Sequence, residues 1–288
     1  MSNYENLPVP NEVNVGNTSA ASEFVKLVIA LVLFCIVLVV AVNISARYLA
    51  PYIPFHYEVS LTESVSKKLN DDTSSPSRQY LQELANSLAA RMALPDDMFL
   101  IVHINSSQMP NAFATFGGHI IVTQGLLDLV DSENALAMVL AHEIAHIKHR
   151  DPIAAAGSSV VISIVMGILF GNSDLTTISN ASGLLTQFNY SRAQESAADQ
   201  AAIDALIQYY GHINGAETFF KKMLEKPWSD NAPPEFLSTH PNTPKRLANI
   251  ETLRVNHTNK PLTPLPDFVK QSPPSSDAKQ RGALHRPP

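Results

Sequence analysis

Two histidines and a glutamate near the middle of the chain have the types and spacing of a metal site with its own base. His142, Glu143 and His146 form the pattern H-E-x-x-H. In a helix, His142 and His146 lie one turn apart on one face, so both imidazoles can reach a single cation. Zinc favours nitrogen ligands, and Glu143 would project beside a water on that ion, where it could act as a base. The pattern therefore predicts a zinc site.

The neighbours of this motif argue against a chance occurrence. By composition alone, an H-E-x-x-H arises in roughly one chain in a hundred of this size, and histidine and glutamate on a helix are usually exposed. Here the motif lies among apolar residues at helical spacing, which are Leu136, Val139, Leu140 and Ile147. Two unpaired imidazoles and a carboxylate would be costly to bury among them, and a bound metal offsets that cost.

A third ligand should come from elsewhere in the chain, because two histidines leave a zinc site incomplete. Glu195 and Asp199 lie four residues apart in a second segment of helical character. Glu195 could bind the metal, while Asp199 could accept the N–H of a zinc-bound histidine and so fix its tautomer. On spacing alone, the two carboxylates could equally be solvated charges around Arg192. His149 could compete as a ligand, but Glu195 already supplies the third position.

Taken in order along the chain, these motifs resemble metallopeptidase family 48, the group of HtpX-like and type I CAAX-protease-like zinc endopeptidases of the gluzincin type. The ordered combination is far more specific than H-E-x-x-H alone. The resemblance covers roughly residues 78 to 252. The segments that carry it are residues 142–146, 191–199 and 238–241 with Arg246, and, upstream, residues 111–114 and 118–123.

The resemblance implies a set of roles around one zinc ion per chain. His142, His146 and Glu195 would be the zinc ligands. Glu143 would be the catalytic base, and Asp199 would support one of the ligands.

Three further assignments depend on the resemblance. His240 and Arg246 would lie near the site and stabilise the transition state, although a lone histidine before a proline is more often a surface loop residue. An edge strand would pair with extended substrate, whereas its alternation alone fits an ordinary edge strand equally well. The residues of that strand are Asn111, Ala112, Phe113 and Ala114.

The metal motif requires helices and a few strands around it. Ser132 is a plausible N-cap for a helix over residues 133–149, in which basic residues fill the last turn. Residues 98–104 have strand character, and Gly117-Gly118 predicts the turn of a hairpin with arms at 111–116 and 120–123. Further helices are expected at residues 76–92, from about 189 to 206, within 211–225, and at 244–254.

We therefore expect an α+β fold that is mainly helical. It would be a zincin-like metallopeptidase domain with a small antiparallel sheet, over residues 76–259, preceded by one transmembrane helix. His103 and His119, lone histidines on strands, are expected to be structural.

An uncharged apolar run near the start predicts the transmembrane helix. Residues 27–46 lie between Lys26 and Arg47, and this length matches the roughly 30 Å hydrocarbon core of a bilayer. The expected organisation is a disordered tail at 1–23, an uncleaved anchor at 24–46 and a stalk at 47–75. A second disordered tail, rich in Pro and Ser, is expected at 260–288.

A second apolar stretch at residues 153–170 is shorter and contains several small and polar residues. If it crossed the bilayer, Glu195 would lie on the opposite side from His142, so we expect it within the fold or on the membrane surface. Residues 171–183 could cover the active-site cleft.

Composition narrows the class of partner. A formal charge of −6 and a pI near 5.9 give no reason to expect nucleic acid. The single cysteine, Cys35, excludes an intrachain disulfide. The bilayer and protein or peptide substrates remain as partners. The basic residues on the two sides of the apolar run at 27–46 almost balance, so they do not set its orientation. A short N-terminal tail that stays cytosolic would place the catalytic domain on the periplasmic side of a bacterial inner membrane.

The resulting hypothesis is a membrane-anchored zinc metalloendopeptidase, which the family and the anchor associate with quality control of membrane or envelope proteins. A hypothesis of another class is a non-catalytic, zinc-stabilised, chaperone-like module that holds clients. A CAAX prenyl protease would be expected to have several spans around a chamber, whereas this chain offers one firm span.

Overall fold

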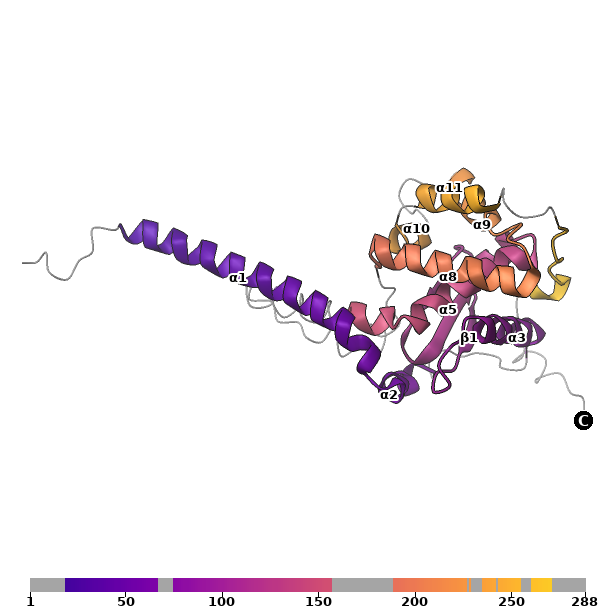
Figure 1. The fold of residues 1–288 in the computed structure, drawn as a ribbon, viewed down its shortest axis with the longest axis horizontal. Coiled ribbons are helices and arrows are strands. Elements are labelled where there is room, and N and C mark those ends of the chain that lie inside the picture. Colours follow the sequence, from indigo (N-terminus) through magenta and orange to yellow (C-terminus); the bar gives the residue numbers. More distant parts are fainter. Residues whose placement is uncertain are drawn as a thin grey trace, which may run out of the picture.

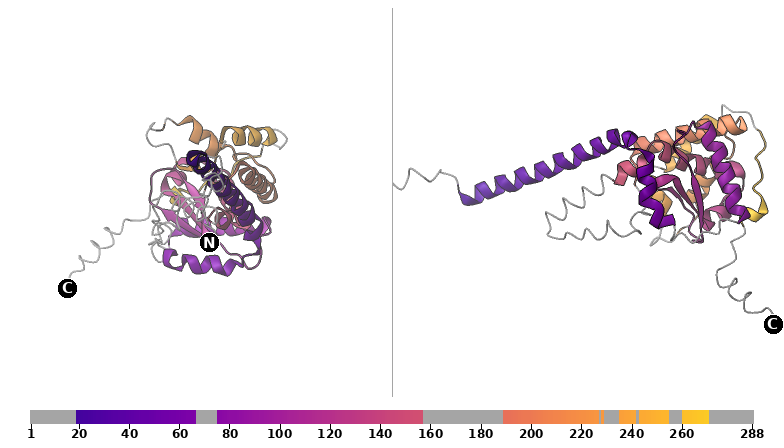
Figure 2. Two further views of the ribbon diagram at one scale, coloured as in Figure 1. Left: turned by 90° about the vertical axis from the view of Figure 1, so that its left-hand side faces the viewer. Right: turned by 90° about the horizontal axis from the view of Figure 1, so that it is seen from below.

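One long apolar helix projects from the body that carries the other elements (Figure 1). The computed structural model describes residues 19–66, 75–156, 189–226, 228, 235–241, 243–254 and 260–270. Helix α1 (Ala20–Leu49) contains the predicted apolar run, and Ala20–Val42 makes no buried contact with the body. Among the described residues it is the one helix long and apolar enough to cross a bilayer. Figure 2 shows it extending from one end of the body.

The expected stalk is wrong for residues 55–66, which form the packed helix α2 (Phe55–Ser66) after a short 3₁₀ turn, η2 (Ala50–Tyr52). Phe55, Glu58 and Thr62 are buried. Their spacing of three and four residues places them on one helix face, which packs on the turn η3 (Phe116–Gly118). The hydrophobic pattern missed this helix because two of these three buried residues are polar.

A three-stranded sheet lies beside α2, with the strand order β1-β3-β2. The predicted hairpin is present: β2 (Ala112–Ala114) pairs antiparallel with β3 (His119–Thr123). Strand β1 (Ile101–Asn105) pairs parallel with β3, so the sheet is mixed and not wholly antiparallel as expected. The loop after β1 carries the chain past the position of β3 to the far edge. Alternation in the sequence shows which face is buried but not the direction of a partner strand.

The metal motif lies in the central helix α5 (Glu133–Lys148), as predicted. The N-cap Ser132 accepts a hydrogen bond from the amide of Ala135, and every residue from Asn134 to Ile147 is buried. Helix α5 packs against α8 (Arg192–Tyr210), α3 (Pro76–Arg91) and β2. The remaining elements are α4 (Gln124–Leu129), α9 (Thr218–Glu225), α10 (Glu235–Thr239), α11 (Thr243–Arg254) and η5 (Asp267–Lys270).

The predicted C-terminal tail is wrong for residues 260–270, which lie along the body. The amide of Glu133 donates to the carbonyl of Thr263 at 3.0 Å, and the amide of Thr263 donates to Asn134 at 2.8 Å. Val269 is fully buried. This strap is held largely through its backbone, which no side-chain pattern reveals.

Several predictions fall on residues outside the described part of the chain. These are most of the N-terminal tail (1–18), nearly all of the second apolar stretch and the covering segment (157–188), and the last residues (271–288).

Candidate active site

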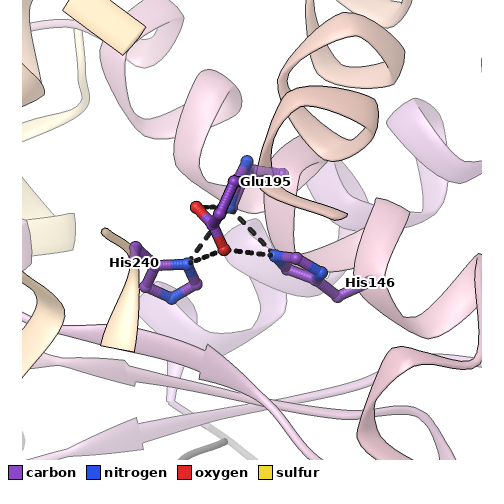
Figure 3. Close-up of side chains that lie close together, drawn as sticks. His146, Glu195 and His240 are labelled. Atoms are coloured by element: carbon purple, nitrogen blue, oxygen red, sulfur yellow. Dashed lines mark hydrogen bonds and ion pairs between the residues drawn. The ribbon is translucent and has the colours of Figure 1, made fainter. Parts of the chain in front are cut away.

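Four buried side chains from three elements converge at the centre of the domain. His142 and His146 come from α5, Glu195 comes from the first turn of α8, and His240 directly follows α10. Each offers one ligand atom, and these atoms all lie within 4.8 Å of one another. Figure 3 shows the Glu195 carboxylate between the rings of His146 and His240. The three predicted ligands are therefore together, with His240 beside them.

The spacing of these atoms fits a zinc ion. The two Nε2 atoms of His142 and His146 are 3.1 Å apart. The Glu195 carboxylate oxygens lie 3.5 Å from Nε2 of His146 and 3.6 Å from Nε2 of His142. Ligands at the usual zinc distances, arranged as a tetrahedron, are about 3.3–3.5 Å from one another. The donor set of imidazole nitrogens and a carboxylate is also one that zinc prefers.

His240 lies between the metal cluster and Glu143. Its Nδ1 is 3.0 Å from Glu195 and 3.3 Å from Nε2 of His142, whereas its Nε2 is 3.7 Å from Oε1 of Glu143. Its backbone amide donates to Phe236 of α10, whose ring stacks on the imidazole. In this position His240 could complete a metal site. It could instead face the substrate and stabilise the transition state, which is the role that the resemblance implied.

The sequence places Glu195 by starting α8 just before it. Ser191 is the N-cap, and its side chain accepts a hydrogen bond from the amide of Gln194. The side chain of Gln194 in turn accepts from the backbone amide of Ser191, which completes a capping box. Because this box fixes the start of the helix, it also fixes the direction in which Glu195 projects.

Each metal-site histidine on α5 has a carboxylate behind it. Nδ1 of His142 lies 3.0 Å from Asp199, the residue expected to support a ligand, and Nδ1 of His146 lies 2.8 Å from Asp151. Both contacts favour the proton on Nδ1, which leaves Nε2 free to bind a metal. Asp151 was not predicted, because it lies five residues after His146 and beyond the end of the helix, where helical spacing gives no guidance.

Arg246 holds two carboxylates and lies behind the ligands. Its guanidinium donates two hydrogen bonds to Asp199, at 2.8 and 2.7 Å, and its Nη1 is 2.8 Å from Glu195. Burial alone would raise the pKa of Asp199, but hydrogen bonds from His142 and Arg246 lower it to about 2. Arg246 thus stabilises the arrangement of Glu195 and Asp199, and its geometry indicates positioning more than contact with a substrate.

Glu143 is fully buried with one of its oxygens unengaged. Oε2 accepts a hydrogen bond from the amide of Ala114 at 2.8 Å. Oε1 has no hydrogen-bond partner in the described part of the chain. Burial raises the pKa of Glu143 above its ordinary value. An oriented carboxylate with a free oxygen beside the metal cluster is what a base that accepts a proton from water requires.

Strand β2 lies at the edge of the sheet next to Glu143. Asn111 exchanges hydrogen bonds with Thr123. Along an antiparallel pair, every second residue turns its backbone N–H and C=O toward the partner strand, so the backbone groups of Phe113 point toward β3. The backbone groups of Ala112 and Ala114 therefore face away from the sheet, and the amide of Ala114 meets Glu143 on that side. Of the predicted substrate strand, Ala112 and Ala114 present an edge to the site.

Sequence reasoning also missed Tyr190, whose ring stacks on His146 with centroids 3.9 Å apart. Among the described residues, the other histidines considered in the sequence analysis lie outside the cluster. His103 and His119 stack on each other in the sheet, joined by a 2.7 Å hydrogen bond, and His149 is an exposed C-cap of α5.

Comparison with known proteins places this site in a known family. The model of peptidase family M48 matches residues 75–254. The chain is 30% identical over 191 residues to a putative beta-barrel assembly-enhancing protease of Vibrio cholerae, which covers 59% of this chain and 38% of that protein. It is 28% identical over 180 residues to the mitochondrial metalloendopeptidase OMA1 of Schizosaccharomyces pombe, covering 61% and 52%.

A protease HtpX homolog of Sulfurovum sp. is 30% identical over 212 residues, which is 60% of this chain and 75% of that protein. The matched part spans about two fifths of the length of the beta-barrel assembly-enhancing proteases.

Proposed function

We propose that this chain, which belongs to peptidase family M48, is a membrane-anchored zinc endopeptidase that hydrolyses peptide bonds in protein substrates. The observation that carries the proposal is the convergence of His142, His146 and Glu195 on one point, with the unengaged oxygen of Glu143 beside them. Family membership supports a metallopeptidase, and the buried cluster supports zinc as its metal.

In this proposal His142, His146 and Glu195 hold the zinc ion. When bound, zinc would act as a Lewis acid that lowers the pKa of a water toward about 7 and polarises the substrate carbonyl. Asp199 and Asp151 keep the two imidazoles in the tautomer that presents Nε2, and Arg246 keeps Glu195 in place.

Glu143 moves the protons. The amide of Ala114 fixes its Oε2, so Oε1 can accept a proton from the attacking water and deliver it to the leaving amine. His240 lies 3.7 Å from the same oxygen through its Nε2 and is the side chain that we assign to stabilising the oxyanion. Arg246 has no such role in this proposal, since its guanidinium is engaged by two carboxylates.

An extended substrate would lie along strand β2. The N–H and C=O of Ala112 and the C=O of Ala114 face away from β3 and can pair with a peptide backbone. Because backbone pairing is insensitive to side chains, such a site would accept many sequences. This suits a protease that removes faulty proteins.

The anchor suggests where those proteins are. Helix α1 supports attachment to a membrane, for which we propose a single span in a bacterial inner membrane with the peptidase on the periplasmic side. Substrates would then be membrane or envelope proteins, in keeping with relatives named for beta-barrel assembly. Protease accessibility of the domain in spheroplasts tests the orientation.

The substitution Glu143→Gln tests the function. The variant should keep its zinc, because Glu143 is not a ligand, and should cleave casein about 10²- to 10⁴-fold more slowly. A chelator should abolish cleavage by the wild-type chain, and zinc should restore it.

Glu83→Gln, an exposed change on α3, is the matched control. Near wild-type cleavage by Glu143→Gln would refute the assignment. Casein binding without cleavage by the wild-type chain would favour the chaperone-like module instead.

A further inference from the structure

Helix α2 inserts one carboxylate between two elements that carry the active site. Glu58 is buried, and its Oε1 lies 2.9 Å from the guanidinium of Arg150, which is also buried. The other oxygen of Glu58 accepts the amide of Gly117 at 3.1 Å. Glu58 therefore touches both the end of the metal helix α5 and the turn between β2 and β3.

On the first of these elements, Arg150 stands where the chain leaves α5, immediately before Asp151. Its φ of +63° is in the left-handed region, which disfavours side chains and is usually occupied by glycine after a helix. The guanidinium also donates to the carbonyl of Ile53 at 2.7 Å and lies over the ring of Phe55. The conformation that directs Asp151 back to His146 is thus held by contacts from Ile53, just before α2, and from α2 itself.

On the second element, Gly117 allows α2 to approach the hairpin turn closely. Its φ is +66°, and a Cβ at this position would lie 2.6 Å from Oγ1 of Thr62 and 3.2 Å from the backbone of Val59. Three residues earlier in the chain, the amide of Ala114 holds Glu143. The contact of Glu58 with this turn therefore affects the position of β2, the strand whose Ala114 amide orients Glu143.

We propose that Glu58 is a positioning residue for the peptidase site. Through Arg150 it fixes the backbone that presents Asp151 to His146, and through Gly117 it fixes the turn that follows Ala114. Helix α2, which lies outside the region matched by the family model, is then part of the catalytic unit, and the turn η2 connects it to the apolar helix α1. This inference rests on the proposed function.

The chemistry of the pair suits positioning better than stabilisation. A buried ion pair adds little stability relative to apolar side chains of the same size, because both charges lose their hydration. A carboxylate with one oxygen against an arginine guanidinium and the other accepting a backbone amide nevertheless has a narrow range of orientations. The pair therefore specifies geometry at two places beside the site.

The test compares two variants of the full chain in detergent. Glu58→Gln removes the charge and keeps an acceptor for Gly117. The double variant Glu58→Gln/Arg150→Met also removes the unpaired buried charge, so its thermal stability should recover toward wild type. Leu81→Ala, a core change on α3, is the control for stability loss alone.

Zinc affinity is measured by competition with a chelator, and kcat and KM are measured with a fluorogenic peptide. Both Glu58 variants should bind zinc about tenfold more weakly and show a kcat about tenfold lower, with KM within about twofold of wild type. Leu81→Ala should change neither below its unfolding temperature.

A double variant that regains stability together with wild-type zinc affinity and kcat would overturn the inference, since the pair would then be structural. If the single variant does not fold, the double variant decides alone. If neither folds, α2 is required for folding and the positioning role is rejected. A wild-type chain that binds zinc but does not cleave refutes the proposed function. The zinc affinity of the Glu58 variants would still test whether Glu58 is a positioning residue. A wild-type chain that binds no zinc refutes both.

Discussion

Replacing Asp151 with asparagine should weaken zinc binding although Asp151 cannot touch the metal. One carboxylate oxygen lies 2.8 Å from Nδ1 of His146, and the other accepts the side-chain amide of Gln194 at 2.6 Å. Both positions need an acceptor, and asparagine has only one oxygen. If the NH2 group of the introduced asparagine faces Gln194, it meets the NH2 group of Gln194, and the two donors have no acceptor between them. If the introduced NH2 group faces His146, the imidazole proton moves to Nε2, the atom that should bind zinc.

The size of the effect follows from the hydrogen bond that is lost. A hydrogen bond to a charged group contributes about 1.5–3 kcal/mol, and about 1.4 kcal/mol corresponds to a factor of ten in affinity. The zinc Kd of Asp151→Asn should therefore rise by about ten- to a hundredfold, the range found for partners of zinc-bound histidines.

The assay is chelator competition on the full chain, with Asp204→Asn as the matched control. Asp204 is an exposed aspartate on α8 that also accepts a glutamine side chain, at 3.0 Å from Gln200, but lies away from the metal cluster. The control should bind zinc like the wild type. If folded Asp151→Asn has a zinc Kd within about twofold of the control, Asp151 does not set the orientation of His146, and the reasoning is refuted.

Two further predictions concern the ligand set and the sheet. Glu195→Ala should lose zinc on purification, as measured by elemental analysis, because two histidines alone do not complete the site; full zinc content would exclude Glu195 as a ligand. Burial and the neighbouring His103 lower the pKa of His119 from 6.5 to about 4. As the pH drops through that range, His119 is protonated in the unfolded chain before it is protonated in the folded chain. The free energy of unfolding should therefore fall over the same range. His119→Asn should show a shallower fall between those pH values in urea titrations, and equal slopes would contradict the buried neutral histidine.

Most of the side-chain cluster could be predicted from the sequence because two of its members share one helix. Helical spacing alone brings His142 and His146 together, and it also pairs Glu195 with Asp199 on α8. What spacing could not decide is that the two helices lie side by side with these faces in contact. The resemblance to a family supplied that step, and the structure agrees with it.

Asp151 and His240 show where spacing stops being informative. The chain turns back after α5 through Arg150 in a left-handed conformation, and an arginine gives no sequence signal for that turn as a glycine would. His240 contacts Glu195 across 45 residues of sequence, and nothing in its neighbourhood except the resemblance distinguishes it from a surface histidine.

The fold was predictable wherever burial is apolar. Helices α3, α5 and α8 and the hairpin follow hydrophobic periodicity, capping residues and turn glycines, which are local properties. The direction of β1 relative to β3 could not be predicted from local sequence, because parallel pairing depends on where a loop places the next strand.

The two misread segments have a common physical cause, and it bears on where the catalytic unit ends. Helix α2 is held by a buried ion pair, and the strap at residues 260–270 is held by backbone carbonyls, so both are attached through polar groups whose partners are distant in sequence. Neither segment lies within the matched residues 75–254. Without α2, Arg150 would keep a buried charge with no carboxylate opposite it, and without the strap the amide of Glu133 at the start of the metal helix would lose its acceptor. The segments at both ends of the domain therefore support the helix that carries His142 and His146, and the folded unit is larger than the region that sequence similarity marks out.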